Sequence, residues 1–179
     1  PNKFTEMALQ GLNEVQELVR RHGHQEVDSW HLFASIVRQE NGVVPAILDN
    51  MGVTASAVQL AVERELEKFP KASGSVDMSR LYATQAFQDS LNSAEKQSKD
   101  LKDEFISTEH LFLGIVDVKK PATLEKFLKS FGLEKPKVLA ALEKVRGNQR
   151  VTSRTPEATF QALEKYGQDL VKDAKTGKL

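Results

Sequence analysis

The feature that most constrains the fold of this chain is an internal repeat with a spacing of 79 positions. The motif His-Leu-Phe at residues 31–33 recurs at residues 110–112, and Thr5 recurs as Thr84. The matched residues keep the same spacing over several helix lengths, which is explained by one supersecondary unit that occurs twice. The matched positions are Thr5, Leu12, Asn13, His31, Leu32, Phe33, Ile36 and Val37 with Thr84, Leu91, Asn92, His110, Leu111, Phe112, Ile115 and Val116, and then, after a one-residue insertion, Leu48, Gly52, Val58, Ala61 and Glu63 with Leu128, Gly132, Val138, Ala141 and Glu143.

Each copy has the pattern of four amphipathic helices. In the first copy, apolar residues follow a 3.6-residue period from Phe4 to Val19, which indicates a helix with one buried face. Asp28 and Thr54 are good N-cap residues for later helices, and Gly52 suits a helix end. No segment alternates polar and apolar residues as a strand does. The sequence therefore predicts an all-α fold.

The predicted organisation is two pseudo-repeated four-helix units followed by a C-terminal linker and helix. Repeat 1 spans residues 3–69 and repeat 2 spans residues 79–149. Residues 70–78 read as an exposed linker because Pro, Gly and Ser favour turns. Residues 150–179 carry a helical stripe formed by Phe160, Leu163, Tyr166 and Leu170.

Charge and composition exclude several classes of protein. Lys plus Arg equals Asp plus Glu at 25 each, whereas nucleic-acid binding normally rests on a surplus of cations. The absence of cysteine removes disulfides, thiolate nucleophiles and cysteine-based zinc sites, and it suits a reducing compartment. Apolar runs such as residues 43–48 are far shorter than the about 20 residues that cross a bilayer. We expect a cytoplasmic protein that binds neither nucleic acid nor membrane.

Catalytic constellations are poor. Gly177-Lys178 is followed by Leu179 and lacks the earlier glycine of a phosphate-binding loop, so we expect no ATP binding by this chain. His22, His24 and Asp28 are metal ligands in one interpretation and a polar turn between helices in the other. A small hydrolase or metalloenzyme using this turn is one hypothesis. A chain without catalytic residues, metal or cofactor is the one we favour.

The second copy contains the sharpest local signal. Residues 105–112, Phe-Ile-Ser-Thr-Glu-His-Leu-Phe, resemble the hallmark of the Clp amino-terminal repeat, in which a capping residue precedes Glu-His and an apolar pair. The first copy departs from it, with Trp30 where Glu109 stands in the second. The resemblance covers residues 3–149. Residues 146–152 and 163–170 resemble the linker and entry helix that lead into the first AAA+ ATPase module of ClpB-type proteins.

The resemblance implies a substrate-binding N-terminal domain of an ATP-dependent, ClpB-type disaggregase. Such a domain holds unfolded or aggregated polypeptide weakly in a groove and passes it to the ATPase motor. ATP and Mg²⁺ would then belong to the parent's other modules, the parent would be a homohexamer working with a co-chaperone, and this fragment would be a monomer. The alternative within the same fold is an adaptor-docking domain of a Clp unfoldase that feeds a protease.

The resemblance also implies site residues. The implied groove lies between the repeats, with Thr5, Asp103 and Glu109 on its polar rim and Leu91 in its apolar lining. From the residues alone, Thr5 suits a helix N-cap and Glu109 complements the dipole at a helix start. For Leu91 core packing is the interpretation that we favour, because its repeat partner Leu12 lies on an apolar stripe. Both interpretations of each residue stay open at this stage.

Four further residues carry expectations. His31 and His110 occupy matched positions at helix starts, which predicts that a ring nitrogen bonds backbone or a neighbouring side chain. Trp30, the single tryptophan, is predicted to pack between helices. Ser93 and His110 stand where the family has more apolar residues, which makes the predicted groove less apolar.

Overall fold

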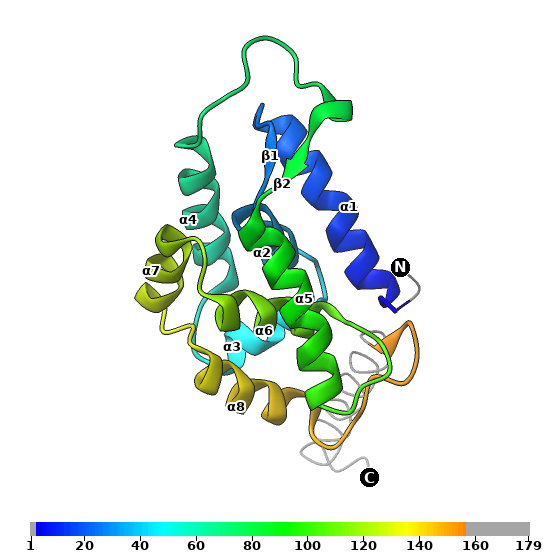
Figure 1. Cartoon of the computed structure of the whole chain (residues 1–179). Coiled ribbons are helices and arrows are strands. Elements are labelled where there is room, and N and C mark those ends of the chain that lie inside the picture. The colour runs from blue at the N-terminus through cyan, green and yellow to red at the C-terminus, as the bar shows by residue number, and fades with distance from the viewer. Residues whose placement is uncertain (1–2, 157–179) are drawn as a thin grey trace, which may run out of the picture.

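The computed structural model describes residues 3–156, so the predicted stripe of Phe160, Leu163, Tyr166 and Leu170 lies outside the described residues. The first copy forms four helices and the second copy forms four more (Figure 1). The predicted all-α fold of two four-helix units is thereby confirmed. The elements are α1 Glu6–Arg21, β1 Glu26–Val27, α2 Ser29–Val37, α3 Val43–Asn50, α4 Ala55–Glu67, the 3₁₀ turn η1 Met78–Arg80, β2 Tyr82–Ala83, α5 Gln85–Asp100, α6 Thr108–Val118, α7 Ala122–Ser130 and α8 Lys135–Arg146.

Helices α2 and α6 form the centre of the molecule. Every residue of α2 is buried, and so are residues 108–116 of α6. The rings of Phe33 and Phe112, which are equivalent in the two copies, lie 5.9 Å apart between their centroids. One buried apolar cluster runs through both copies. The repeated His-Leu-Phe motif therefore lies at the contact between the copies, and they share one core.

Each outer helix crosses its buried partner at a small residue. In the second copy, a Cβ on Gly114 of α6 would lie 2.4 Å from the carbonyl oxygen of Ser90 on α5. At the equivalent crossing in the first copy, Gly11 lies on α1, and Ser35 of α2 donates a hydrogen bond to the Gly11 carbonyl at 2.6 Å. The glycine is on the outer helix in one copy and on the inner helix in the other. Both arrangements allow close approach of the two backbones.

The prediction of no strand is wrong at two places. Strands β1 and β2 pair in parallel, with Val27 opposite Ala83, and an isolated parallel bridge joins Phe4 to Ile106. These pairings are equivalent in the repeat, because Ile106 corresponds to Val27 and Ala83 to Phe4. Pairs this short contain no alternation for a sequence pattern to reveal. The segment before the first helix of each copy therefore pairs with the other copy.

The ends of the helices follow the predicted signals. Asp28 and Thr54 are the N-cap residues of α2 and α4. Gly52 and Gly132 adopt φ angles of +73° and +72° just after α3 and α7, a conformation that glycine allows without steric cost. The predicted inter-repeat linker, residues 70–78, follows α4 and ends at Met78, the first residue of η1. From there the chain passes through β2 into α5. Among the described residues no single helix is long and apolar enough to cross a membrane, and only α3 and α4 together, bent by 111°, reach that length.

The two crossing glycines predict opposite effects of the same substitution. Gly114→Ala should lower the free energy of unfolding by about 3 kcal/mol, because its Cβ meets the backbone of Ser90. Gly11→Ala should be neutral or stabilise by up to about 1 kcal/mol, because its Cβ would lie 3.4 Å from the nearest atom and alanine favours a helix. Urea unfolding of both variants measures this. Equal effects of the two substitutions would contradict the packing described here.

Candidate functional site

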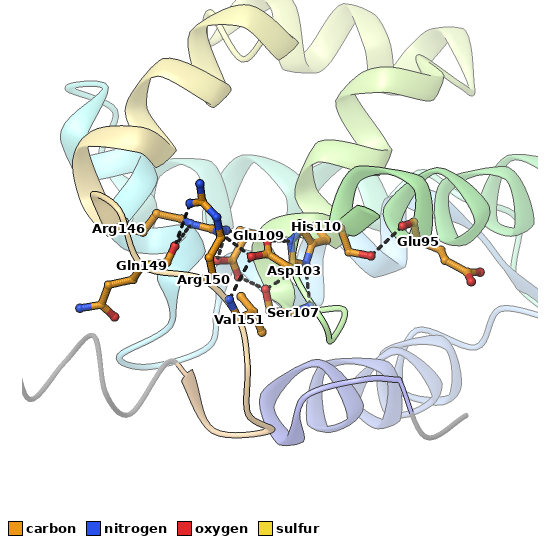
Figure 2. Close-up of polar contacts among 10 residues, drawn as sticks. Glu95, Asp103, Ser107, Glu109, His110, Arg146, Gln149, Arg150 and Val151 are labelled. Carbon is orange, nitrogen blue, oxygen red and sulfur yellow. Dashed lines mark hydrogen bonds and ion pairs between the residues drawn. The ribbon is translucent and has the colours of Figure 1, made fainter. Parts of the chain in front are cut away.

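Three of the four predicted site residues lie where separate parts of the chain meet. The Thr5 N–H donates to the Ile106 carbonyl at 2.9 Å, and the Ile106 N–H donates to the Lys3 carbonyl at 2.6 Å. Asp103 and Glu109 flank this contact in sequence, and Figure 2 shows their carboxylates within one polar cluster. Thr5 and Glu109 are fully buried, as is the side chain of Asp103. The three side chains lie beneath the surface, and their contact with a bound polypeptide stays a prediction.

Asp103 is the centre of this cluster. Its carboxylate accepts a forked pair of hydrogen bonds from Arg146 at 2.6 and 2.9 Å, one from His110 Nε2 at 2.6 Å and one from the Val151 N–H at 2.9 Å (Figure 2). Burial by itself raises the pKa of Asp103. The hydrogen bonds from His110, Arg146 and Val151 outweigh burial and lower that pKa to about 2. Asp103 is therefore a buried, ionised anchor.

Glu109 shares the same cation. Ser107 Oγ donates to one oxygen of Glu109, and the other oxygen lies 3.6 Å from Arg146 Nη1. The Arg146 side chain is 3% exposed, so the partners of its buried positive charge are these two carboxylates. Sequence reasoning missed Arg146. The signal was available, because the repeat places Arg146 opposite Leu66 and Asp103 opposite His24, which are changes towards charge at buried positions.

Thr5 has the local role that its residue type favours. It is the N-cap of α1, and its Oγ1 accepts the Ala8 N–H at 3.2 Å. Its repeat partner Thr84 caps α5 in the same way, accepting the Phe87 N–H at 3.1 Å. The N-cap interpretation of Thr5 is thus confirmed.

Leu91 is not brought together with the other three. It is half-buried on α5, packed against the common core. Ser93, two residues further along α5, donates to Asp117 of α6 at 2.7 Å, and His110 donates to Asp103. Both polar departures from the family pattern are therefore satisfied inside the second copy. Two surface hollows of about 460 and 480 Å³ lie along α8, and none of the four predicted residues lines either.

The predicted structural role of the two matched histidines is confirmed. His31 Nδ1 accepts the Asp28 N–H at 3.0 Å, and His110 Nδ1 accepts the Ser107 N–H at 2.8 Å. Since Nδ1 accepts in each ring, the proton of the neutral ring is on Nε2. In the second copy it is donated to Asp103. In the first copy it is donated to His24 Nδ1 at 2.8 Å.

The environment of the first-copy pair favours neutral rings. Burial, with smaller contributions from His24 and His22, lowers the pKa of His31 to about 3. Burial likewise lowers the pKa of His24.

Trp30, 2% exposed, packs edge-on against Phe127 of α7, which confirms its predicted place between helices.

The residues of the proposed metal turn point to different partners. His22 contacts Glu63 and Glu67 of α4 at 3.0 and 3.1 Å, whereas His24 bonds His31 and Asp28 caps α2. Within residues 3–156, no three His, Cys, Asp or Glu side chains are placed so that they could hold one metal ion.

The chain after α8, residues 149–155, is bound across the cluster and is called the exit segment below. The Glu104 N–H donates to the Val151 carbonyl at 2.8 Å, and the Glu6 N–H donates to the Arg154 carbonyl at 2.8 Å. Val151 is fully buried, and the Arg154 guanidinium lies 5.5 Å from the centre of the Phe105 ring. The exit segment thus contacts both the 103–106 loop and the start of α1.

Comparison with known proteins gives a consistent result. Residues 3–131 match the family described as the Clp repeat (R) N-terminal domain. The chaperone protein ClpB of Nitratidesulfovibrio vulgaris is 44% identical over 99% of this chain, and that of Clostridium tetani is 39% identical over 99%. This chain spans about a fifth of the length of those relatives, 21% and 20%.

Solved structures show the same fold. The Hsp104 N-terminal domain from Candida albicans superposes with a TM-score of 0.74 at 19% sequence identity, covering 87% of this chain and 99% of that one. The N-terminal domain of the chaperone ClpD from Arabidopsis thaliana gives a TM-score of 0.59 at 18% identity, covering 80% of this chain and 94% of that one.

The buried ion pair predicts a pH-dependent loss in one variant. Asp103→Asn should lower the free energy of unfolding by about 3 kcal/mol near neutral pH, because it leaves the Arg146 charge buried without its main partner. Since the folded pKa of Asp103 is depressed, its contribution is complete above its ordinary pKa of 3.8 and is lost as the pH falls towards 2. Urea unfolding across this range should show variant and wild type converging.

An exposed ion pair provides the control for this variant. Glu65→Gln removes the pair with Lys68, whose side chain is 71% exposed, and should cost about 0.5 kcal/mol or less. A cost for Asp103→Asn as small as this would show that the buried pair does not anchor the domain.

The neutral histidine pair predicts a second loss of stability on the acid side, which begins at a higher pH than that of Asp103. Unfolded His31 takes up a proton below its ordinary pKa of 6.5, whereas folded His31 does not until about pH 3. The free energy of unfolding should therefore fall between pH 6.5 and 3, by about 1.4 kcal/mol per pH unit for one withheld proton. Urea unfolding at several pH values measures this slope.

His31→Gln is the matched variant, because glutamine at this position can still accept the Asp28 N–H but does not titrate. It should flatten the slope. An unchanged slope, or a His31 ring that titrates near pH 6.5 by NMR, would contradict the expectation.

Proposed function

Because the chain belongs to the Clp repeat (R) N-terminal domain family, we propose that it is the substrate-collecting domain of an ATP-dependent, ClpB-type chaperone. The observation that carries the proposal is the 44% identity to a ClpB chaperone over 99% of the chain. A Clp repeat domain is not a catalytic domain. The proposed role is to hold unfolded or aggregated polypeptide briefly and pass it to an ATPase motor outside this chain.

The proposed binding surface consists of the half-buried apolar residues of the two outer helices. Leu91 and Phe87 of α5 and Leu12 of α1 pack on the core with only part of their surface. Covering such side chains with an apolar segment removes hydrophobic area from water, which is favourable and has no preferred direction. Ordering a flexible chain takes back much of the gain. Weak binding with loose sequence preference follows, which suits a domain that must release its clients.

The remaining parts of the proposal concern the whole protein. ATP and Mg²⁺ belong to its ATPase modules, which assemble as a homohexamer in the cytoplasm and work with a co-chaperone, while this domain alone is a monomer. The similarity to ClpB chaperones continues beyond the second repeat, to 99% of the chain, and supports this proposal over adaptor docking for a protease-feeding unfoldase.

Two apolar residues on different helices test the proposal, Leu91 of α5 and Leu60 of α4. Leu91→Ser should weaken binding of an unfolded apolar polypeptide by about tenfold, the effect of losing one aliphatic contact. Leu60→Ser, on α4 and 55% exposed, should leave the affinity unchanged. Residue-resolved NMR titration of the 179-residue chain gives both affinities and the location of the shifts.

The outcomes separate the candidates. Shifts around Leu91 that saturate weakly support substrate collection at this surface. Equal loss in both variants, or no shifts at high polypeptide concentration, sinks the proposed site. In the latter case, binding of a folded adaptor protein becomes the better account.

A further inference from the structure

The exit segment is held to the domain by backbone hydrogen bonds to two separate parts of the chain. Its carbonyl groups at Val151 and Arg154 accept N–H groups from Glu104 and Glu6, which belong to two different parts of the chain. In return, the Val151 N–H is accepted by Asp103. Backbone hydrogen bonds of this kind place no demand on sequence and give an extended peptide its register.

Two side chains of the exit segment add selectivity. Val151 is fully buried, so an aliphatic side chain fills a closed site next to Asp103. Three positions later, Arg154 lies over the face of Phe105, an arrangement that attracts a cation. The residues between them are exposed and carry no such anchor. The site therefore recognises an aliphatic residue followed three positions later by a basic residue.

We propose that residues 151–154 are a removable strap, the chain's own occupant of a site that binds the backbone of an extended polypeptide segment with this aliphatic and basic spacing. The site is formed by Glu6, the 103–106 loop and the Phe105 ring. It rests on the proposed function, since its natural occupant in trans is a segment of an unfolded client. The strap lies outside residues 3–69 and 79–149, the two predicted repeats.

The contacts of Asp103, which the resemblance placed on a substrate rim, and of Arg146 assign both residues a role in holding the strap. Asp103 accepts the strap's Val151 N–H, and Arg146 fixes Asp103 by its forked contact while donating to the Gln149 carbonyl at 3.0 Å. Asp103 and Arg146 are thus positioning residues that hold the strap in its site. A strap that fills the site for most of the time lowers the apparent affinity for a competing segment in proportion to the closed fraction.

The experiment removes the side chains of Val151 and Arg154 and leaves Asp103 and Arg146 unchanged. The double variant V151S/R154S in the full 179-residue chain loses the aliphatic and cationic contacts of the strap. Its matched control is T152A/T155A, two exposed positions of the same segment. The first readout is hydrogen exchange at the Glu6 and Glu104 amides, which the strap protects. Exchange at both should be about tenfold faster in V151S/R154S and unchanged in the control, because opening exposes these amides.

The second readout is binding in trans. The probe is the peptide Gln-Arg-Val-Thr-Ser-Arg-Thr, the sequence of residues 149–155. It should restore protection of the Glu6 and Glu104 amides in V151S/R154S, whereas a peptide with serine at the Val and Arg positions should not. An unfolded apolar polypeptide should bind V151S/R154S about fivefold more tightly than wild type or T152A/T155A.

The inference and the proposed function fail in different ways. If wild type binds the unfolded polypeptide but V151S/R154S binds it equally or more weakly, the strap is not a competitor and the proposed function stands. Unchanged exchange at Glu6 and Glu104 also overturns the strap. If neither wild type nor variant binds the unfolded polypeptide, both proposals fall.

Discussion

A helix that is buried on every side cannot satisfy its first backbone N–H groups with water, and this constraint shapes both copies of the repeat. Helices α2 and α6 meet it with a histidine in the first turn, which accepts the N–H of the N-cap residue. The histidine then needs an acceptor for its own Nε2 proton. The segment before each buried helix must supply that acceptor, so the cap, the ring and the preceding loop form one unit in each copy.

The two copies supply different acceptors for this proton. The difference explains why the exit segment binds at the loop before α6. In the first copy, the acceptor is His24, a neutral group. In the second, it is Asp103, whose charge requires Arg146 at a position where the first copy has Leu66. A carboxylate has capacity for more hydrogen bonds than an imidazole, and the spare capacity accepts the Val151 N–H. The charged pair at these two buried positions thus provides the attachment point for the exit segment.

The sequence predicted the features that each helix or each residue determines locally. The repeat, the caps at Thr5 and Asp28 and the structural role of His31 and His110 all follow from residue type and spacing. The burial of Asp103 and Glu109 did not follow, because it depends on Arg146 and Val151, which lie 43 and 48 positions after Asp103 in the chain. The close crossing at Gly114 was equally hidden, since glycine in a helix has no spacing signature and the atom that it avoids belongs to another helix.

The paired short strands have a consequence for the independence of the two copies. Each copy lends the segment before its first helix to the other copy, through Phe4 with Ile106 and Ala83 with Val27. Two separate chains, each carrying one copy, would have to associate as a twofold dimer with exchanged ends before either was complete. In the single chain, covalent connection holds the two copies together, so this exchange of ends does not depend on protein concentration. Cutting the chain between the copies would therefore make the start of each copy's first helix depend on the association of two fragments.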